Sequence, residues 1–254
     1  MFISLLFHRI VNDKNSELID VTKESFERYL TTIIDKSLPL ETIYNLCKKS
    51  KNTYSAKFVS LTFDDGWASD YKIVFSILSK YSVKATFFIT TGWLGKKGFL
   101  TESWLKEMAQ YGMEIGSHTV THRYLTKLSN FEIYKEFYDS KCKLEDILGK
   151  EIISVSIPGG EYNKRIIDLA FESGYKIIAT SRPGWNRNNK VISRISIHAR
   201  TSLEDFSAIV NFSSSYRVRL LVHYRLRSIL KKALGIEQYK KIRKYLIKDF
   251  SCCH

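Results

Sequence analysis

Short apolar runs alternate with longer amphipathic segments along most of the chain. A strand buried on both faces of a parallel sheet is apolar throughout, so it appears as a continuous run rather than an alternating one. Strands are therefore predicted over residues 2–7, 58–63, 84–90, 113–117, 152–157, 176–180 and 191–198.

The segments between these runs have the spacing of helices, with apolar residues three or four positions apart. Ser129 and Glu132 form a capping-box pattern at the start of one such segment. Gly174 supplies a left-handed stop after another. Helices are predicted over 22–50 (two helices, the first capped by Thr22), 71–80, 129–148, 163–173 and 202–210.

This alternation predicts a parallel sheet with crossover helices. Seven strands within a single-domain length favour a (β/α)7 TIM-like barrel over residues 1–211, and an open doubly wound sheet is the alternative. Both architectures place functional groups at the carboxyl ends of the strands.

Composition fits a large folded domain, with 254 residues, 44% hydrophobic residues and only 3 prolines. The N-terminal apolar stretch is short and is interrupted by His8 and Arg9, so it indicates a core strand rather than a signal peptide. No cysteine pair has zinc-site spacing, which favours a reduced, intracellular protein. No apolar stretch approaches the ~20 residues of a membrane span.

Charge is concentrated in the tail. The net charge is +14, and residues 212–254 hold eleven Lys and Arg against two acidic residues. Apolar residues recur at helical spacing over 216–248, and Gly235 is expected to divide this stretch into two helices. A basic amphipathic helix fits an anionic membrane surface. No nucleic-acid motif accompanies it, so nucleic acid is not an expected partner.

Candidate chemistry lies at the predicted strand ends. Asp64 and Asp65 follow the second strand, and His118 and His122 follow the fourth. In a helical turn, two histidines four residues apart lie on one face and can bind one ion. One carboxylate added to them makes a two-His, one-Asp set that suits zinc or another divalent transition metal.

The stretches "LTFDDGW" and "EIGSHTVTH" together resemble the polysaccharide deacetylase family, also called the NodB-homology domain or carbohydrate esterase family 4. Further stretches, "ATFFITTGWLG" and "FESGYKIIATS", resemble the family in the same order, and the resemblance covers about residues 1–210. The opening "LLFHRIV" followed by "VTKESFERYL" resembles a branch that handles extracellular or cell-surface glycans.

The resemblance implies a distorted barrel and metal-dependent removal of acetyl groups, chiefly N-acetyl groups, from sugars. It makes Asp64 the general base and Asp65, His118 and His122 the metal ligands. Zn²⁺ is the expected metal, with Co²⁺ as an alternative. An acetylated glycan is the expected substrate, which a cytoplasmic protein would meet at the inner face of the membrane.

Other residues are assigned by position. Pro158, Gly159 and Tyr162 follow the fifth strand and are expected to contact substrate; a backbone N–H of the turn at 158–160 would stabilise an oxyanion. Trp185 is expected to stack on a sugar. His198, at the end of the last strand, is the expected catalytic acid.

Alternatives remain for several of these positions. His223 competes with His198 for the acid role but is expected on the tail helix, and His8 is a candidate for the barrel mouth or for packing. Trp67 is expected to pack. The family often has an arginine where this chain has Ser156 and an aromatic residue where it has Gly159, so a catalytically impaired barrel that binds glycan or acts as a scaffold is the alternative function.

Overall fold

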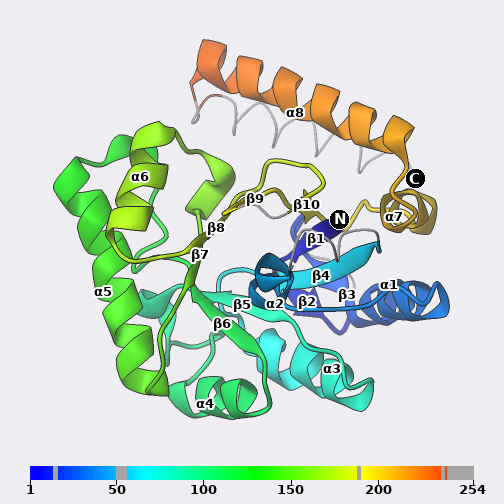
Figure 1. The fold of residues 1–254 in the computed structure, drawn as a ribbon, viewed down its shortest axis with the longest axis horizontal. Helices are drawn as coiled ribbons and strands as arrows, with labels where there is room; N and C mark the ends of the chain where they lie inside the picture. The colour runs from blue at the N-terminus through cyan, green and yellow to red at the C-terminus, as the bar shows by residue number, and fades with distance from the viewer. Residues whose placement is uncertain (14–16, 50–55, 188–189, 236–237, 239–254) are drawn as a thin grey trace. The chain divides into compact units, whose positions relative to one another are not determined.

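The computed structural model describes residues 1–13, 17–49, 56–187, 190–235 and 238. Its main feature is one sheet of eight parallel strands in the order β10-β1-β4-β5-β6-β7-β8-β9 (Figure 1). Their bounds are β1 Phe2–Phe7, β4 Phe58–Phe63, β5 Thr86–Ile89, β6 Glu114–Ser117, β7 Ser154–Ser156, β8 Ile177–Ala179, β9 Val191–Ile192 and β10 Ile195–Ser196.

The two edges of this sheet are formed by one short stretch of chain. β9 pairs with β8 and β10 pairs with β1, although only Ser193 and Arg194 separate the two strands. The sheet is therefore curled, and the predicted distorted α/β barrel is confirmed. The single strand predicted over 191–198 is two strands, because the chain crosses from one edge to the other at this point.

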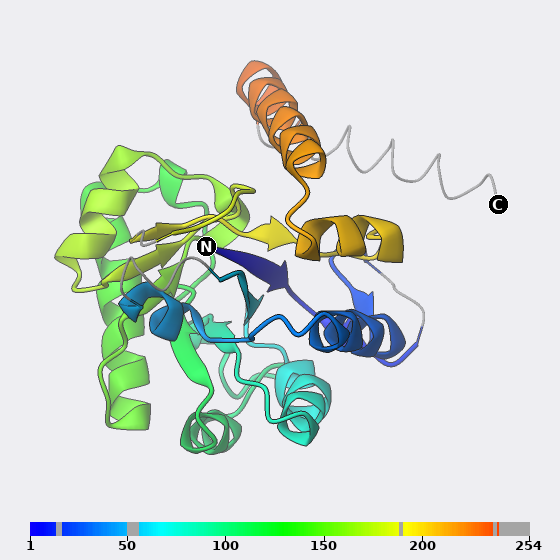
Figure 2. The same ribbon diagram turned by 45° about the vertical axis from the view of Figure 1, so that its right-hand side comes forward.

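The predicted barrel helices are present, most of them on the outside of the curled sheet (Figures 1 and 2), and α4, Glu102–Gln110, was not predicted. The exception is α2, Ile43–Lys48, whose Ile43 and Leu46 belong to a core cluster with residues of five strands. The segment 71–80 starts in a π-helix, η2, Asp70–Phe75, and continues as α3, Ser76–Lys80. The remaining helices of the barrel are α1 Lys23–Asp35, α2 Ile43–Lys48, α5 Asn130–Leu148, α6 Lys164–Glu172 and α7 Leu203–Val210.

Burial explains why the strands are continuous apolar runs. Every residue of β1 and β4 is buried, and the two strands pair in register from Phe2–Phe58 to Phe7–Phe63. Phe63 stacks on Phe7 and on Phe87 of β5, with ring centroids 5.3 and 4.9 Å apart. This register brings the carboxyl ends of β1 and β4 to the same level.

The chain divides into two compact units, Met1–Phe212 and Ser213–His254. In the second unit, α8 spans Ser214–Leu234, and Gly235 follows it with a positive φ of 75°. The second tail helix predicted beyond Gly235 lies outside the described residues. Within the described chain, no helix has the length and apolar character needed to cross a membrane. A small second sheet pairs β2, Ile10–Val11, with β3, Val21–Thr22.

Candidate metal and catalytic site

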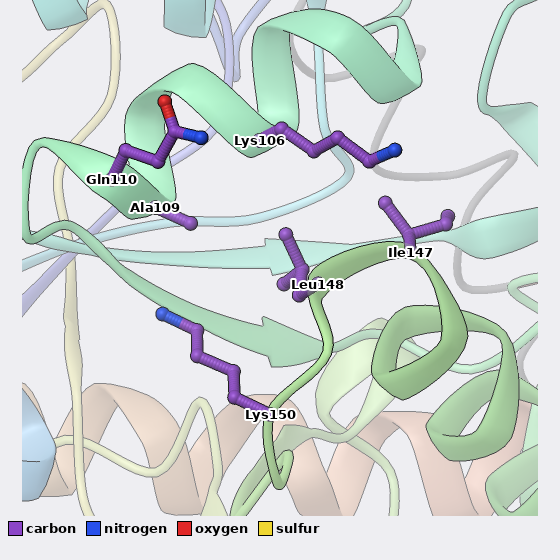
Figure 3. Close-up of a pocket in the computed structure, with 6 residues that line it drawn as sticks. All are labelled: Lys106, Ala109, Gln110, Ile147, Leu148 and Lys150. Carbon is purple, nitrogen blue, oxygen red and sulfur yellow. The ribbon is translucent and has the colours of Figure 1, made fainter.

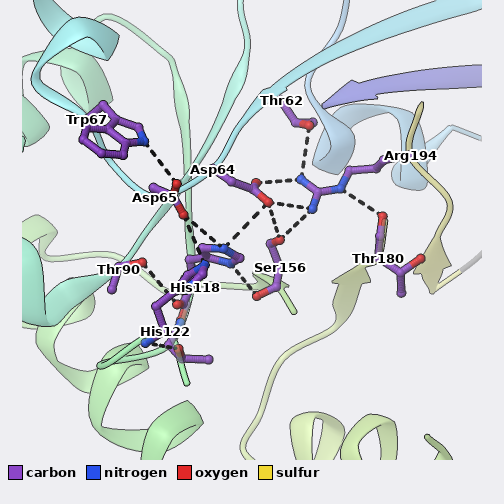
Figure 4. A network of polar contacts seen from close by, with 12 residues as sticks. Thr62, Asp64, Asp65, Trp67, Thr90, His118, His122, Ser156, Thr180 and Arg194 are labelled. Carbon is purple, nitrogen blue, oxygen red and sulfur yellow. Dashed lines mark hydrogen bonds and ion pairs between the residues drawn. The ribbon is translucent and has the colours of Figure 1, made fainter. Parts of the chain in front are cut away.

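The site lies where several neighbouring strands end, as the fold class predicts. Asp64 and Asp65 follow β4, His118 follows β6, and Ser156 is the last residue of β7. Hydrogen bonds and ion pairs connect these four residues into one network (Figure 4). Residues separated by about ninety positions, such as Asp64 and Ser156, are thus in direct contact.

The two adjacent aspartates point to different partners because the backbone turns between them. The Asp64 N–H continues the sheet by donating to the Phe7 carbonyl at 3.0 Å. Asp65 has a left-handed φ of 81°, a conformation that aspartate tolerates better than most residues, and Gly66 follows with φ 83°. The Asp64 carboxylate therefore faces Arg194, whereas the Asp65 carboxylate faces the histidines (Figure 4).

Asp65, His118 and His122 form a three-ligand cluster, and one ligand atom from each lies within 4.8 Å of the others. The Asp65 Oδ1 atom is 3.5 Å from His118 Nε2 and 3.3 Å from His122 Nε2. This oxygen is buried and has no hydrogen-bond partner among the described residues. A buried carboxylate oxygen facing two imidazole nitrogens fits a divalent cation, and three protein ligands leave a coordination position open.

The environment of His118 prepares it as a ligand. Its Nδ1–H donates to the Ser156 carbonyl at 2.8 Å, which leaves the Nε2 lone pair directed at the cluster. Burial lowers the pKa of His118 to about 4, even though Asp64 acts in the opposite direction. The ring is therefore neutral near pH 7, as a metal ligand must be.

The segment between the two histidines is a loop, so the helical turn expected from their spacing is wrong. Thr119 and His122 have left-handed φ values of 64° and 59°, which a helical turn does not contain. The rings nevertheless converge, with centroids 4.9 Å apart. The left-handed conformation is costly for a β-branched threonine, so other contacts must hold the loop in place.

Glu136 of α5 supplies the main contacts. One of its carboxylate oxygens accepts from the backbone N–H groups of Val120 and Thr121, both at 2.9 Å, and the other accepts from the Thr121 hydroxyl. Glu136 is only 5% exposed, so its carboxylate depends on these donors rather than on water. The carboxylate therefore anchors the middle of the loop that carries both histidines.

Gly92 holds the other side of the same loop. Its N–H donates to the Val120 carbonyl at 2.9 Å, and a Cβ at this position would overlap that oxygen. The loop is thus fixed between the end of β5 and α5.

Arg194 is the residue of this site that the sequence analysis missed. It is fully buried, and its guanidinium makes a bidentate ion pair with Asp64, with N–O distances of 2.7 and 2.8 Å (Figure 4). The remaining donors reach Thr62 Oγ1, the Thr180 carbonyl and Ser156 Oγ. Ser156 Oγ in turn donates to Asp64 at 2.9 Å. The cation expected beside Asp64 thus comes from the crossing between β9 and β10.

Three buried carboxyl groups near the site have different protonation preferences. Burial alone would raise the pKa of Asp64, but the charge and hydrogen bonds of Arg194 hold it well below its usual value. The pKa of Asp65 is also lowered against the effect of burial, chiefly by its histidine neighbours. Burial and the nearby Asp65 instead raise the pKa of Asp70, which favours its neutral form. Asp64 and Asp65 are therefore the two ionised groups.

Aromatic side chains line one side of the cluster. Trp67, expected only to pack, donates its indole N–H to Asp65 Oδ2 at 3.1 Å and stacks on Phe99 with centroids 4.7 Å apart. Trp93 contacts both Phe99 and His122, at centroid distances of 4.9 and 5.2 Å. All three aromatic residues are partly exposed, so they form a candidate wall for an apolar sugar face.

A second aromatic group lies near the turn after β7. Pro158 is buried, and Gly159 adopts a left-handed φ of 68°. A Cβ on Gly159 would overlap the ring of Tyr124, so the small residue lets this ring lie against the turn. Gly159, which stands where the resemblance leads us to expect an aromatic residue, therefore has an aromatic ring packed against it from another part of the chain. Tyr162 is partly buried in the loop that follows.

Two histidines follow the neighbouring strands β1 and β10. His8 follows β1, it lowers the pKa of both Asp64 and Asp65 through its charge, and its Nδ1 is buried without a described hydrogen-bond partner. His198 follows β10, and its Nδ1 accepts the Arg200 N–H at 3.2 Å. The acid role assigned to His198 stays a prediction, with His8 as a second candidate. His223 lies on α8, as expected.

Trp185 is placed differently from the other predicted substrate contacts. Its neighbour Asn186 pairs with Phe2 at the beginning of β1, the end of the sheet opposite the site. The Trp185 ring packs against Phe212, at a centroid distance of 5.8 Å. We therefore leave Trp185 out of the proposed site.

A groove elsewhere on the barrel is separate from this site. It lies between α4 and the end of α5 (Figure 3), and none of the residues described above lines it. Its lining residues are Lys106, Ala109, Gln110, Ile147, Leu148 and Lys150.

Replacing Arg194 by methionine is expected to lower the free energy of unfolding at pH 7 by about 3 kcal/mol or more, because Asp64 stays buried without its charge partner. In the wild type, the depressed pKa of Asp64 contributes stability above about pH 4 that is lost as the pH falls. The difference between the two proteins should therefore be smaller near pH 4 than at pH 7. Urea unfolding measures both values, and equal differences would contradict the assignment.

Replacing Glu136 by alanine is expected to weaken binding of Zn²⁺ by about 10- to 100-fold, because the histidine loop loses its anchor. Glu132→Ala is the matched control: Glu132 lies on the same helix and also accepts a backbone N–H, but from Ser129. Competition with a chromophoric chelator measures the affinity. Equal affinities of the two variants would show that Glu136 does not position the ligands.

Comparisons with known proteins agree with this geometry. The family described as polysaccharide deacetylase matches residues 51–178, which is half of the chain. A putative polysaccharide deacetylase of Bacillus subtilis, YxkH, is 33% identical over 71% of this chain and 64% of its own. A peptidoglycan-N-acetylglucosamine deacetylase of Bacillus cereus is 32% identical over 52% of this chain and 59% of its own. The chain thus spans less than two thirds of these relatives.

A solved structure extends the likeness over the whole barrel. The Streptococcus pyogenes deacetylase PplD, determined in complex with acetate, is 29% identical and superposes with a TM-score of 0.74. The superposition covers 80% of this chain and 95% of PplD. With the matched family segment, the curled sheet and the Asp-His-His cluster at its strand ends, the chain belongs to the polysaccharide deacetylase family.

Proposed function

We propose that this protein is a metal-dependent hydrolase that removes acetyl groups, most readily N-acetyl groups, from a sugar of a glycan. The observation that carries the proposal is the Asp65-His118-His122 cluster beside an Asp64 that is kept ionised. The relatives named for N-acetylglucosamine deacetylation support the substrate class. Zn²⁺ is the proposed ion, because two imidazoles and one carboxylate with an open position suit it.

Each residue of the site has a role in amide hydrolysis. When bound, the cation would lower the pKa of a coordinated water and polarise the acetyl carbonyl. Asp64 accepts the proton of the attacking water. Its Oδ2 lies 3.8 Å from the ligand atom His118 Nε2, so this carboxylate lies directly beside the ligand cluster. Arg194 and Ser156 hold the carboxylate in place throughout. The turn at Pro158–Gly160 is the proposed source of a backbone N–H for the oxyanion.

The leaving nitrogen must receive a proton, and a histidine is the natural donor. We propose His8 for this step ahead of His198, because the buried His8 Nδ1 has no hydrogen-bond partner among the described residues, whereas His198 Nδ1 already accepts the Arg200 N–H. His8 directly follows Phe7, and Phe7 pairs with Phe63, the residue before Asp64. His8 and Asp64 therefore leave two paired strands at the same level.

The zinc-loaded protein is expected to release acetate from N-acetylated oligosaccharides, and Asp64→Asn should lower kcat at least about a hundredfold. Asparagine keeps the shape of the side chain but cannot take up a proton as a carboxylate does. Chelator competition must show that the variant still binds Zn²⁺, which separates lost chemistry from a lost metal. Wild-type turnover by a metal-loaded Asp64→Asn protein would refute the mechanism.

Replacing His8 by glutamine is expected to remove the descending limb of the pH–rate profile and to lower kcat by about 10²- to 10⁴-fold, because the leaving nitrogen loses its acid. His198→Gln is the matched comparison and should retain most of the activity. A substrate with a phenol leaving group, which departs without a proton, should be far less affected by the His8 change. If the two variants exchange behaviour, His198 is the acid.

The alternative, a barrel that binds glycan without turnover, was motivated by Ser156 and Gly159. Arg194 and the ring of Tyr124 occupy the corresponding space from other parts of the chain, which weakens that motivation. Zinc binding without acetate release from a broad panel of N-acetylated glycans and lipid-linked sugars would favour the alternative.

We also propose that the substrate is met at the inner face of a membrane, by a cytoplasmic protein. The support is the composition of the tail, residues 212–254, which contains eleven basic residues and only two acidic ones.

A further inference from the structure

We propose that α8 is a membrane-surface helix, which lies on an anionic lipid bilayer with one apolar face inserted. This proposal concerns the second unit alone and does not depend on the deacetylase activity of the barrel.

The helix presents large apolar side chains to solvent. Val218, Val222, Leu226 and Ile229 are three or four residues apart, so they lie on one face, and their exposed fractions range from 50% to 62%. Leu230 extends the same face and is 49% exposed. Five of the eleven large hydrophobic residues that are exposed in the described chain thus lie on this one helix, although the barrel contains most of the described residues.

The charge of the helix indicates what kind of surface covers this face. The sequence of Ser214–Leu234 contains six Lys and Arg and no acidic residue. Arg217 and Arg227 lie away from the apolar face and Arg225 lies at its edge, where long cationic side chains can reach lipid headgroups. The helix also begins at a regular N-cap, in which Ser213 accepts the Tyr216 N–H, so it needs no partner to start.

An anionic bilayer satisfies both features at once. A nucleic acid would take the basic residues but would leave the apolar face in water. The rest of the chain is itself net basic, because the tail residues 212–254 account for a net charge of +9 out of the total of +14. An acidic, lipid-covered surface therefore complements the helix in charge and in hydrophobicity.

The test uses the full chain and vesicles of phosphatidylcholine with or without 30% phosphatidylglycerol. Co-sedimentation is expected with the anionic vesicles, weakening as salt rises from 50 to 500 mM, since headgroup attraction is screened. Leu226→Asp with Ile229→Asp should reduce partitioning by about tenfold or more, because the inserted face is lost. Arg225→Gln with Arg227→Gln should reduce binding to anionic vesicles only.

Phe131→Asp is the matched control. Phe131 is 76% exposed on α5 of the barrel, so its replacement, compared with the single change Leu226→Asp, removes one exposed apolar residue and adds one negative charge elsewhere. It should leave vesicle binding unchanged. Thermal unfolding of the same proteins distinguishes another occupant: a drop in Tm of several degrees for the α8 variant would mean that the face packs on protein.

Besides that drop in Tm, three results would overturn the proposal. The first is no binding to anionic vesicles, and the second is equal binding by the wild type and the Leu226→Asp, Ile229→Asp variant. The third is a short DNA duplex that displaces the protein from vesicles and binds the apolar-face variant as tightly as the wild type, which would assign the helix to nucleic acid instead.

Discussion

The buried ion pair between Arg194 and Asp64 is the interaction on which the rest of the site depends. Two charges without access to water are costly unless they are paired and fully hydrogen-bonded, and here every donor of Arg194 reaches an oxygen. The pair spans from β4 to the crossing between β9 and β10, so it ties the catalytic aspartate to the place where the curled sheet meets itself.

Pairing with Arg194 also separates the roles of the two adjacent aspartates. Asp64 is held by Arg194 and kept ionised beside the cluster, whereas Asp65 is the carboxylate that lies nearest both histidines. The left-handed backbone at Asp65 makes this division possible, and Trp67 holds the second Asp65 oxygen. The histidine loop is fixed separately, from α5 by Glu136 and from the end of β5 by Gly92.

Sequence pattern predicted the strands and the ligand cluster because both depend on local order: apolar runs mark buried strands, and parallel strands end at one edge. It failed where the answer depends on contacts between distant segments. Arg194 lay within a run taken as one apolar strand, although a cation between Ile192 and Ile195 could have signalled a buried carboxylate partner. The histidine loop was expected to be helical because its two histidines are four residues apart. Spacing alone cannot reveal the left-handed residues Thr119 and His122, which flank the two N–H groups that Glu136 binds.

The state of Asp64 can be observed directly by following its ¹³C carboxyl resonance with pH in the metal-free protein, assigned by comparison with Asp64→Asn. An ordinary aspartate is about half protonated near pH 4. If Arg194 holds Asp64 as described, the resonance stays at the position of the ionised form from pH 7 down to pH 4. A titration with its midpoint at or above pH 4 would contradict the account.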